Sequence, residues 1–284
     1  MRALVFGGTG MLGQAVASHW RRRQSAVLAL SRDHADIADR DRLLYWADAF
    51  RPQLIINCAA FTKVDLCEER RDHALRINGT AVASVVAAAA SVSARLVHIS
   101  SDYVFDGRAE RPYQENDPTG PMSVYGESKL QGEKEALRYD KSLVLRASWL
   151  FGPGGPNFVA TIRRLLLEGR LPLRVVDDQV GCPTYTPFLA RAIWRLAAMD
   201  DATGIWHYRN RDAVSWHGFA KEIAAKVAPN AEVLPVSTEE FPRPAPRPAW
   251  SVLDVKTYES ATGRRVEPWD LGLEAYLDLL GENS

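Results

Sequence analysis

A tyrosine and a lysine four residues apart, Tyr125 and Lys129, are the side chains of this sequence best suited to proton transfer. On a helix, four-residue spacing places both on one face. A free phenol has a pKa of about 10, so it relays protons poorly at neutral pH unless a nearby cation favours the phenolate. We expect Lys129 to supply that cation. Because this pattern also occurs on ordinary amphipathic helices, it needs support from other features.

The N-terminus carries a second chemical feature, a glycine turn between an apolar run and a helical pattern. Residues 3–6 indicate a strand, and Gly7, Gly10 and Gly13 follow before a helix is expected. Such glycines let the chain turn sharply, let a pyrophosphate approach the backbone, and let the helix pack on the sheet. The spacing is G-x-x-G-x-x-G rather than G-x-G-x-x-G. We interpret it as a dinucleotide site; the alternative is an ordinary glycine-rich turn.

A polar run after another apolar segment is the third feature. Residues 95–99 indicate a buried strand, and the run 100–103, Ser-Ser-Asp-Tyr, follows directly. In doubly wound sheets, ligands bind at the carboxyl ends of the strands. A hydroxyl there could share a substrate oxygen with Tyr125, which suits a carbonyl that receives a hydride. The alternative is a turn whose side chains cap the backbone.

Strand and helix patterns alternate in the part of the chain that must position these residues. Strands are predicted at residues 27–30, 54–57, 96–99 and 143–146, and a helix is predicted over 81–94. This order predicts an α/β fold with a doubly wound parallel sheet of Rossmann type. The pattern changes at a Gly/Pro loop, residues 152–156, and at a Pro-rich segment, residues 242–248. We expect residues 1–150 to form an NAD(P)-binding domain and residues 151–284 mainly a smaller α/β substrate domain.

Composition excludes several functional classes. The 284 residues are 46% hydrophobic and 25% charged, as in an ordinary globular enzyme, and the formal net charge of zero gives no footprint for nucleic acid or anionic membrane. No stretch approaches about 18 uncharged apolar residues, and the N-terminus enters a strand rather than a signal peptide. We therefore expect a cytoplasmic protein without nucleic-acid or membrane partners. Cys58, Cys67 and Cys182 lack metal-ligand spacing, so they are predicted to be reduced and structural, and no metal site is predicted.

Together these residues resemble the extended short-chain dehydrogenase/reductase family, and more closely its dTDP-4-dehydrorhamnose reductase branch. The likeness spans nearly the whole chain. Its most specific runs lie at residues 102–105 and 178–184, with further matches at 57–65, 146–149 and 247–248. Cys58, Phe61 and Ser101 stand where the family more often has alanine, histidine and threonine. None of these departures removes a group that the family's reaction requires.

The resemblance implies NAD(P)H-dependent reduction of the C4 keto group of dTDP-4-dehydro-6-deoxy-L-mannose to dTDP-L-rhamnose. The catalytic residues would be Ser101, Tyr125 and Lys129. The cofactor residues would be Gly7, Gly10, Met11, Leu12, Gly13, Ser31, Arg32, Asp36, Ile37, Ala59, Ala60 and Phe61, together with Tyr125 and Lys129. The substrate residues would be Ser101, Asp102, Trp149, Gln179, Thr184 and Arg247. For Trp149 the alternative is core packing, and for Arg247 it is an exposed loop position.

The end of the second predicted strand bears on the choice of cofactor. A site for NAD usually has an acidic residue about 20 residues past the glycines, but here Ser31 and Arg32 occupy that place. A hydroxyl and a guanidinium suit a 2′-phosphate, so NADPH is the expected donor. Asp33 follows, and the branch accepts either nucleotide, so NADH also stays open. Alternatively, Arg32 is only a solvated surface charge.

The resemblance leaves other readings open. One is a different nucleotide-sugar 4-ketoreductase with the same hydride chemistry, and another is a non-catalytic regulatory subunit with the same fold. Extended reductases also return a later segment to the first sheet. Some members pair as homodimers, in certain cases around Mg²⁺ held by glutamates. Gln14 and Ala15 stand where an acid would be wanted, so Mg²⁺ is not expected here.

Overall fold

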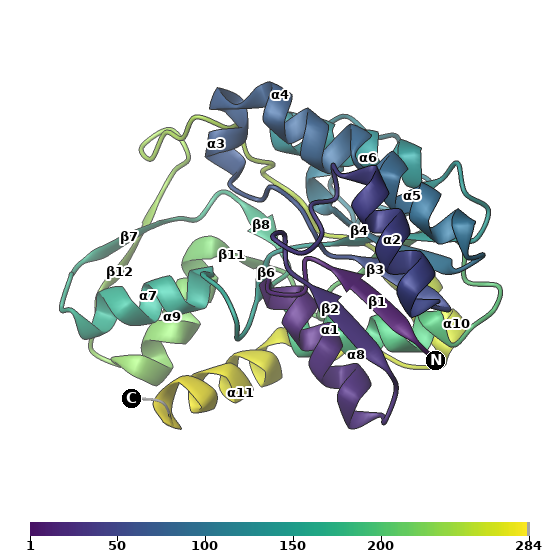
Figure 1. The fold of residues 1–284 in the computed structure, drawn as a ribbon. Helices are drawn as coiled ribbons and strands as arrows, with labels where there is room; N and C mark the ends of the chain where they lie inside the picture. The colour runs from purple at the N-terminus through teal and green to yellow at the C-terminus, as the bar shows by residue number, and fades with distance from the viewer. Residues whose placement is uncertain (283–284) are drawn as a thin grey trace.

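Six parallel strands form the central sheet of the computed structural model, which describes residues 1–282 (Figure 1). Their order is β10-β5-β4-β3-β1-β2. The bounds are Ala3–Phe6 for β1, Val27–Leu30 for β2, Leu54–Asn57 for β3, Arg95–Ser101 for β4, Ser142–Ala147 for β5 and Gly204–Tyr208 for β10. The predicted doubly wound parallel sheet is therefore confirmed. β1 pairs in parallel with β2 on one side and with β3 on the other. Successive strands are therefore added in opposite directions from β1, and folds of this type bind ligands at that switch point.

Helices cover both faces of this sheet. In Figure 1, α2 (Arg40–Phe50), α5 (Val82–Ser91) and α6 (Val124–Ala136) lie above it, and α1 (Met11–Arg22) and α8 (Thr186–Ala197) lie below it. Successive side chains of β1 point to opposite faces, so Val5 joins the lower hydrophobic cluster while Leu4 and Phe6 join the upper one. All three are fully buried, which explains why this strand is a continuous apolar run.

One helical stretch, Arg71–Ser91, is long and apolar enough to cross a membrane by length and composition. It combines α4 (Arg71–Ala74), a π-helical turn η1 (Leu75–Thr80) and α5. The sequence expectation concerned a run of about 18 uncharged apolar residues, and this stretch is no such run, since it contains Arg76, Asn78 and Thr80. Half of the stretch is buried within the protein, and Val82 and Val85 belong to the upper hydrophobic cluster. Its apolar character is thus accounted for by packing against the sheet.

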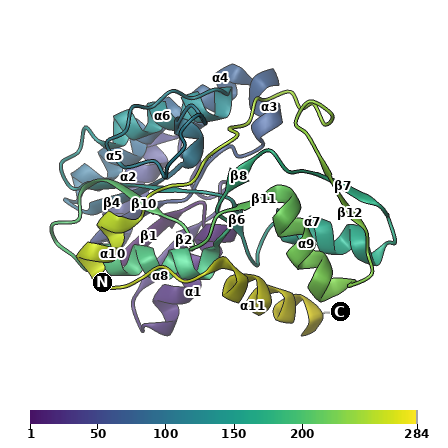
Figure 2. The ribbon, with the colours of Figure 1, turned by 180° about the vertical axis from the view of Figure 1, so that it is seen from behind.

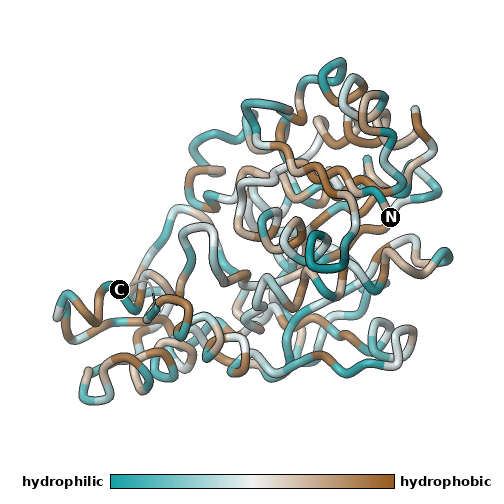
Figure 3. Tube along the Cα trace, turned by 60° about the horizontal axis from the view of Figure 1, so that its bottom comes forward, coloured by the Kyte–Doolittle hydropathy of each residue, from teal (hydrophilic) through white to brown (hydrophobic). Residues whose placement is uncertain are grey.

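The C-terminal part of the chain forms a smaller lobe with its own hydrophobic cluster. Figure 3 shows this lobe, which carries the C-terminus, beside the larger one. It contains α7 (Phe158–Leu167), α9 (Trp216–Val227) and α11 (Trp269–Glu282), with the parallel pair β7 (Leu173–Val176) and β12 (Val233–Val236). Two further short pairs join β6 (Leu150–Phe151) to β9 (Thr184–Tyr185), and β8 (Val180–Gly181) to β11 (Val214–Ser215).

Some segments beyond residue 150 belong to the larger lobe. β10 pairs in parallel with β5, and α8 packs against α1, as Figure 2 shows from behind. The remaining helices are α3 (Val64–Glu69), the 3₁₀ turn η2 (Asp102–Val104) and α10 (Lys256–Thr262). The chain thus crosses between the lobes more than once, and the division at residue 150 stays a prediction.

Candidate active site

The glycine turn after β1 leads into α1 without any side-chain cap. Gly10 is the N-cap residue, its backbone is extended, and the first turn of α1 has no acidic residue. The N–H groups at a helix start have no partner within the helix, and the helix dipole favours an anion beside them. The start of α1 therefore suits a negatively charged ligand such as a pyrophosphate.

The glycines of this turn differ in what surrounds them. Gly7 has a φ of +77°, and a Cβ there would lie 2.6 Å from the Ala59 nitrogen. A Cβ on Gly13 would lie 2.2 Å from the Gly7 oxygen. By contrast, a Cβ on Gly10 would meet only the Gly7 oxygen, at 3.3 Å. Gly7 and Gly13 thus serve the folding of the turn itself, whereas Gly10 leaves open space that a dinucleotide could fill.

A cavity of about 220 Å³ opens beside the turn, at the carboxyl ends of β1, β2 and β3. Its lining includes the predicted residues Gly7, Gly10, Arg32, Asp36, Ile37, Ala59, Ala60 and Phe61. Sequence reasoning missed the other lining residues, Thr9, Ala35, Cys58, His73 and Ile77. Thr9 and Cys58 adjoin predicted positions, but no local signal points to His73 and Ile77, which come from α4 and η1.

Six predicted cofactor residues do not line this cavity, and two of them, Tyr125 and Lys129, lie on α6. Leu12 and Gly13 are buried beneath the turn, and Met11 begins α1. The Ser31 hydroxyl lies 2.7 Å from Nδ1 of His34. If Ser31 binds a ligand, it must therefore exchange this local hydrogen bond.

Arg32 and Asp36 pair with each other at the edge of the cavity. The Arg32 Nε and an Asp36 oxygen lie 3.3 Å apart, and the Arg32 side chain is 68% exposed. An ion pair this exposed contributes little to stability, so it holds the guanidinium only weakly. Arg32 can therefore turn toward an anionic ligand at small cost.

Asn78 ties the cavity wall to the helix that carries the proton-transfer pair. It accepts the N–H of Phe61 at 2.7 Å and donates both to the Phe61 oxygen at 3.0 Å and to the Ser128 hydroxyl at 2.9 Å. Ser128 lies on α6 between Tyr125 and Lys129. This buried amide therefore fixes the position of α6 relative to the dinucleotide cavity.

The proton-transfer pair lies on α6 as predicted, but its electrostatics differ from the expectation. The buried Lys129 donates from Nζ to the Ile99 oxygen at 2.6 Å, and burial lowers its pKa to about 8. Burial raises the pKa of Tyr125, and the charge of Asp102 raises it further. In this structure the pKa of Tyr125 is therefore raised rather than lowered as expected, because burial is the largest influence on it and the Lys129 ammonium is bound to a backbone carbonyl.

Ser101 is both a turn cap and a neighbour of Tyr125. It closes β4, accepts the N–H of Tyr103 at 3.2 Å at the start of η2, and donates to Asp102 Oδ1 at 2.8 Å. Its hydroxyl also lies close enough to Tyr125 to oppose the rise in that residue's pKa. Ser101 can therefore cap the backbone turn and still offer its hydroxyl to a substrate oxygen beside Tyr125. Asp102 is buried, and its desolvation raises its pKa to about 6.

A buried ion pair, which sequence reasoning missed, joins the helix that carries Tyr125 and Lys129 to the central sheet. Arg146 on β5 donates to both carboxylate oxygens of Glu133 on α6, at 2.8 Å and 2.7 Å. The Ser100 hydroxyl donates to the same carboxylate at 2.5 Å. Removing one partner of such a pair leaves an unpaired buried charge, which typically costs about 3–5 kcal/mol. The pair thus fixes α6 against β4 and β5.

Two predicted substrate residues outside the central sheet, Gln179 and Arg247, already hold polar partners within the protein. Gln179 donates from Nε2 to the Thr238 hydroxyl at 2.9 Å. Arg247 lies 2.9 Å from an Asp65 oxygen and donates to the Ala245 oxygen at 2.8 Å. Arg247 is therefore neither a free exposed charge nor an open anion site in this state.

Trp149 and Thr184 contrast with each other. Trp149 has a φ of +46° and is partly exposed, and its ring stacks on that of Trp216. Thr184 is fully buried in β9, and its hydroxyl donates to the Cys182 oxygen at 3.4 Å. A direct contact between Thr184 and a nucleotide is therefore not supported, since no part of it reaches the surface. Trp149 is not simply a core residue.

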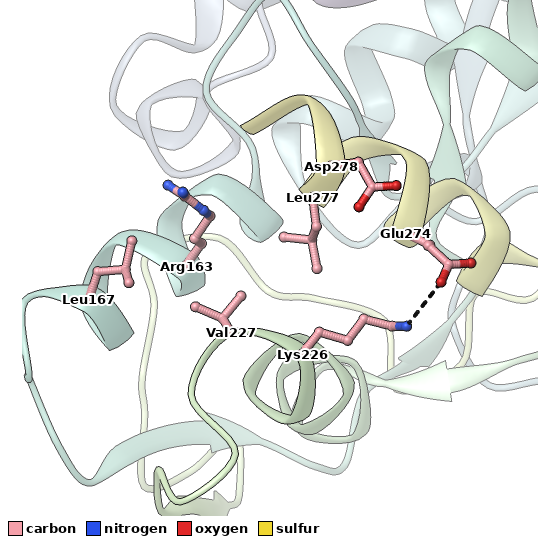
Figure 4. Close-up of a pocket in the computed structure, with 7 residues that line it drawn as sticks. All are labelled: Arg163, Leu167, Lys226, Val227, Glu274, Leu277 and Asp278. Atoms are coloured by element: carbon pink, nitrogen blue, oxygen red, sulfur yellow. Dashed lines mark ion pairs between the residues drawn. The ribbon is translucent and has the colours of Figure 1, made fainter. Parts of the chain in front are cut away.

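A roomier cavity, of about 430 Å³, lies in the smaller lobe between α7, α9 and α11 (Figure 4). Its lining residues are Arg163, Leu167, Lys226, Val227, Glu274, Leu277 and Asp278. Lys226 and Glu274 form an ion pair there at 3.9 Å. None of the predicted site residues lies in it, so we place the site at the carboxyl edge of the sheet.

Metal ligands and reactive thiols do not gather at this edge. Within residues 1–282 there is no group of three or more His, Cys, Asp or Glu side chains that could hold a metal ion. All three cysteines are free, and burial raises the pKa of the Cys58 thiol to about 12. Cys58 therefore lines the dinucleotide cavity as a neutral, unreactive wall residue.

Comparison with known proteins extends over both lobes. The family model of the RmlD substrate binding domain matches residues 1–281. The spore coat polysaccharide biosynthesis protein SpsK of Bacillus subtilis is 39% identical over 277 residues, which cover 97% of this chain and 96% of that protein. A dTDP-4-dehydrorhamnose reductase of Streptomyces griseus is 39% identical over 291 residues, which cover 99% and 94%.

Among solved structures, the dTDP-4-dehydrorhamnose reductase of Bacillus anthracis in complex with NADP is similar over its full length. It superposes with a TM-score of 0.92 at 35% identity and covers 97% of this chain and 98% of that chain. The similarity therefore includes the strand order and the arrangement of the two lobes.

Proposed function

Because the chain belongs to the RmlD substrate binding domain family, we propose that it is an NADPH-dependent dTDP-4-dehydrorhamnose reductase. It reduces the C4 keto group of dTDP-4-dehydro-6-deoxy-L-mannose to give dTDP-L-rhamnose. The observation that carries this proposal is the meeting of Ser101, Tyr125 and Lys129 at the sheet edge that also holds the glycine-turn cavity. Reduction of a carbonyl needs a hydride donor and a proton donor at the same place.

The chain's own residues supply binding and the proton. NADPH, when bound, supplies the hydride. Tyr125 donates its proton to the oxygen that becomes the C4 hydroxyl, and Ser101 donates a hydrogen bond to the same oxygen. Lys129 has three N–H donors and uses one of them on the Ile99 carbonyl, so the others can stabilise the Tyr125 phenolate and hold the nicotinamide ribose. The Ile99 carbonyl thus holds the Lys129 ammonium in place on α6.

Residues around the cavity hold the cofactor. The first turn of α1 receives the pyrophosphate beside Gly10, Ile37 flanks the adenine, and Ala59 lies along the middle of the cofactor. Arg32 exchanges Asp36 for the 2′-phosphate, because a phosphate offers its guanidinium stronger, charge-assisted hydrogen bonds. This exchange favours NADPH over NADH without excluding NADH.

Substrate binding exchanges contacts that the protein now makes with itself. Arg247 can turn from Asp65 to the diphosphate of the nucleotide sugar, and Gln179 can turn from Thr238 to its nucleotide. Asp102 and the edge of Trp149 face the sugar. Thr184 does not contact the substrate and acts only by holding the backbone of Trp149, whose oxygen accepts the Thr184 N–H.

The proposed reaction takes place in the cytoplasm, where soluble nucleotide sugars are made. Assembly into a homodimer belongs to the same proposal. No Mg²⁺ is required in it, because the first helix offers Gln14 and Ala15 rather than acids.

Replacing Tyr125 tests the mechanism. Tyr125→Phe keeps the ring and removes the proton, so we expect turnover of the keto sugar to fall roughly a hundredfold or more. The measurement is the loss of NADPH absorbance with dTDP-4-dehydro-6-deoxy-L-mannose present. Affinity for NADPH, followed by its fluorescence, should stay near the wild-type value. Unchanged turnover would exclude Tyr125 as the proton donor.

A substrate panel separates this function from the alternatives. Wild-type protein is assayed with several nucleotide keto sugars, each with NADH and with NADPH. A preference for another sugar indicates a different 4-ketoreductase. Cofactor binding without consumption of NADPH by any sugar indicates a regulatory subunit.

A further inference from the structure

Two indole rings stack face to face at the junction of the two lobes. Trp149 follows β5, and Trp216 is the first residue of α9. Their ring centroids lie 3.5 Å apart with 3° between the planes. Aromatic pairs prefer offset or edge-on arrangements to a full sandwich, because the negative faces of the two rings repel. The surrounding structure must therefore impose this stack.

Gly181 covers the opposite face of Trp149. A Cβ on Gly181 would lie 2.4 Å from Cε2 of the indole and 2.7 Å from both Nε1 and Cζ2. Since the carbon between those two atoms is the nearest, the Gly181 backbone lies over the ring face rather than beside its edge. Trp216 fills one face completely, so Gly181 must lie on the other. Only the edge of the Trp149 indole is left to meet a ligand.

The backbone of Trp149 is also held in an unusual conformation. Its φ of +46° lies in the left-handed region, which a bulky side chain rarely adopts and which often marks ligand sites. The Trp149 oxygen accepts the N–H of Thr184 at 3.0 Å, and the adjacent Ser148 hydroxyl donates to the Cys182 oxygen at 2.8 Å. The 180–184 segment therefore fixes both the backbone and the ring of Trp149.

The clamped indole lies close to the proton-transfer residues. Ala147 is the register partner of Ser101, so Trp149 follows two residues beyond the partner of that hydroxyl. The charge of Asp102 reaches Cys182, the residue after Gly181. The strand ends that carry Ser101 and Trp149 thus open onto the same space.

We propose that Trp216 is a positioning residue for the substrate: with Gly181 it clamps the Trp149 indole so that the ring meets the sugar by its edge. This inference rests on the proposed function and adds to it. A sugar ring cannot stack on Trp149 while both faces are covered. Recognition by an edge suits the hydroxyl-bearing rim of a hexose rather than its apolar face. Phe158 supports the clamp, since its ring lies 4.6 Å from that of Trp216.

Removing Trp216 tests the clamp. We expect Trp216→Ala to raise KM for dTDP-4-dehydro-6-deoxy-L-mannose roughly tenfold with little change in kcat, because binding is lost equally in the ground and transition states. Trp216→Phe, which keeps a flat ring and the fold, should give an intermediate KM. KM for NADPH should not change in either variant. Trp194→Ala, which removes an indole packed against α1, is the matched control and should leave both KM values unchanged.

A double variant supplies a second readout that a purely structural role would not move. Gly181→Ala forces the Trp149 ring aside, so KM for the keto sugar should rise. In Gly181→Ala/Trp216→Ala the ring can tilt into the space that Trp216 vacated, so KM should fall below that of Gly181→Ala alone. Gly281→Ala, at a position with open space around it, is the control for the added methyl group.

The outcomes separate this inference from the proposed function. If wild-type protein does not consume NADPH with the keto sugar, the proposed function fails. If wild-type protein turns over but Trp216→Phe and Trp216→Ala both keep the wild-type KM, the positioning role is wrong and the reductase function stands. The clamp would also be wrong if the increases in KM of Gly181→Ala and Trp216→Ala simply combined in the double variant.

Discussion

The cofactor side and the substrate side of the site are prepared in different ways. On the cofactor side, Gly10 and Ala59 leave an open cavity whose shape comes from the backbone. On the substrate side, Gln179 and Arg247 already hold hydrogen-bond or ion-pair partners within the protein. A preformed cavity loses little on binding, whereas paired polar groups must exchange one partner for another. Ser31 and Arg32 are the exceptions on the cofactor side, since they hold His34 and Asp36.

The largest expected effect is a loss of stability when the glycine turn on the cofactor side is changed. A Cβ on Gly13 would lie 2.2 Å from a backbone oxygen, so Gly13→Ala should destabilise the fold by more than about 3 kcal/mol. In Gly10→Ala the added Cβ would contact only one atom, at 3.3 Å. This variant should keep the wild-type stability but bind NADPH more weakly. Denaturant unfolding and cofactor titration measure the two effects. Equal stability loss in both variants would contradict the different roles of these glycines.

A smaller effect concerns the buried carboxyl group of the substrate side. Burial raises the pKa of Asp102 from 3.8 to about 6, so folding opposes its ionisation. This cost, about 3 kcal/mol, is fully present above pH 6 and disappears as the pH falls toward 4. Asp102→Asn should therefore be more stable than the wild type at pH 7, and the difference should shrink on acidification. The measurement is the free energy of unfolding of both proteins across this range.

The neighbours of Asp102 do not titrate in that range. Tyr103, Tyr125 and Cys182 face the carboxyl group, and burial raises the pKa of each. They stay neutral near pH 6, so the difference between the two proteins reports on Asp102. A stability difference that is independent of pH would show that Asp102 does not titrate as described.

The smallest expected effect is on the preference for NADPH over NADH. Arg32→Ala should raise KM for NADPH by about tenfold, because an exposed guanidinium that binds a 2′-phosphate contributes about 1–2 kcal/mol. KM for NADH should remain near the wild-type value. Steady-state kinetics with each cofactor provide the measurement. An equal change for both cofactors would mean that Arg32 acts on the cavity rather than on the phosphate.

Local sequence was sufficient to predict much of the sheet and the first half of the site. The strands at residues 27–30 and 54–57 have the predicted bounds, because buried parallel strands are short continuous apolar runs. The predicted residues around Arg32 and Ala59 line one cavity, since each follows a strand and parallel strands end at one edge.

Other features had no local signal. His73 reaches the cavity from a helix, and the Glu133–Arg146 pair joins residues on different elements. The pKa of Tyr125 depends on how deeply its phenol is buried, which residue spacing does not contain. In each case the deciding quantity is a distance or a degree of burial that arises only on folding.

The sequence by itself determined the succession of strands and helices along the first lobe, the glycine turn and the helix that carries Tyr125 and Lys129, because hydrophobic periodicity and backbone freedom act between near neighbours. Only the tertiary structure decided where the Lys129 ammonium lies, which partners hold Arg247, and that both faces of Trp149 are covered. Those contacts join residues far apart in the chain. Their energies depend on desolvation and close packing, which exist only once the lobes have folded together.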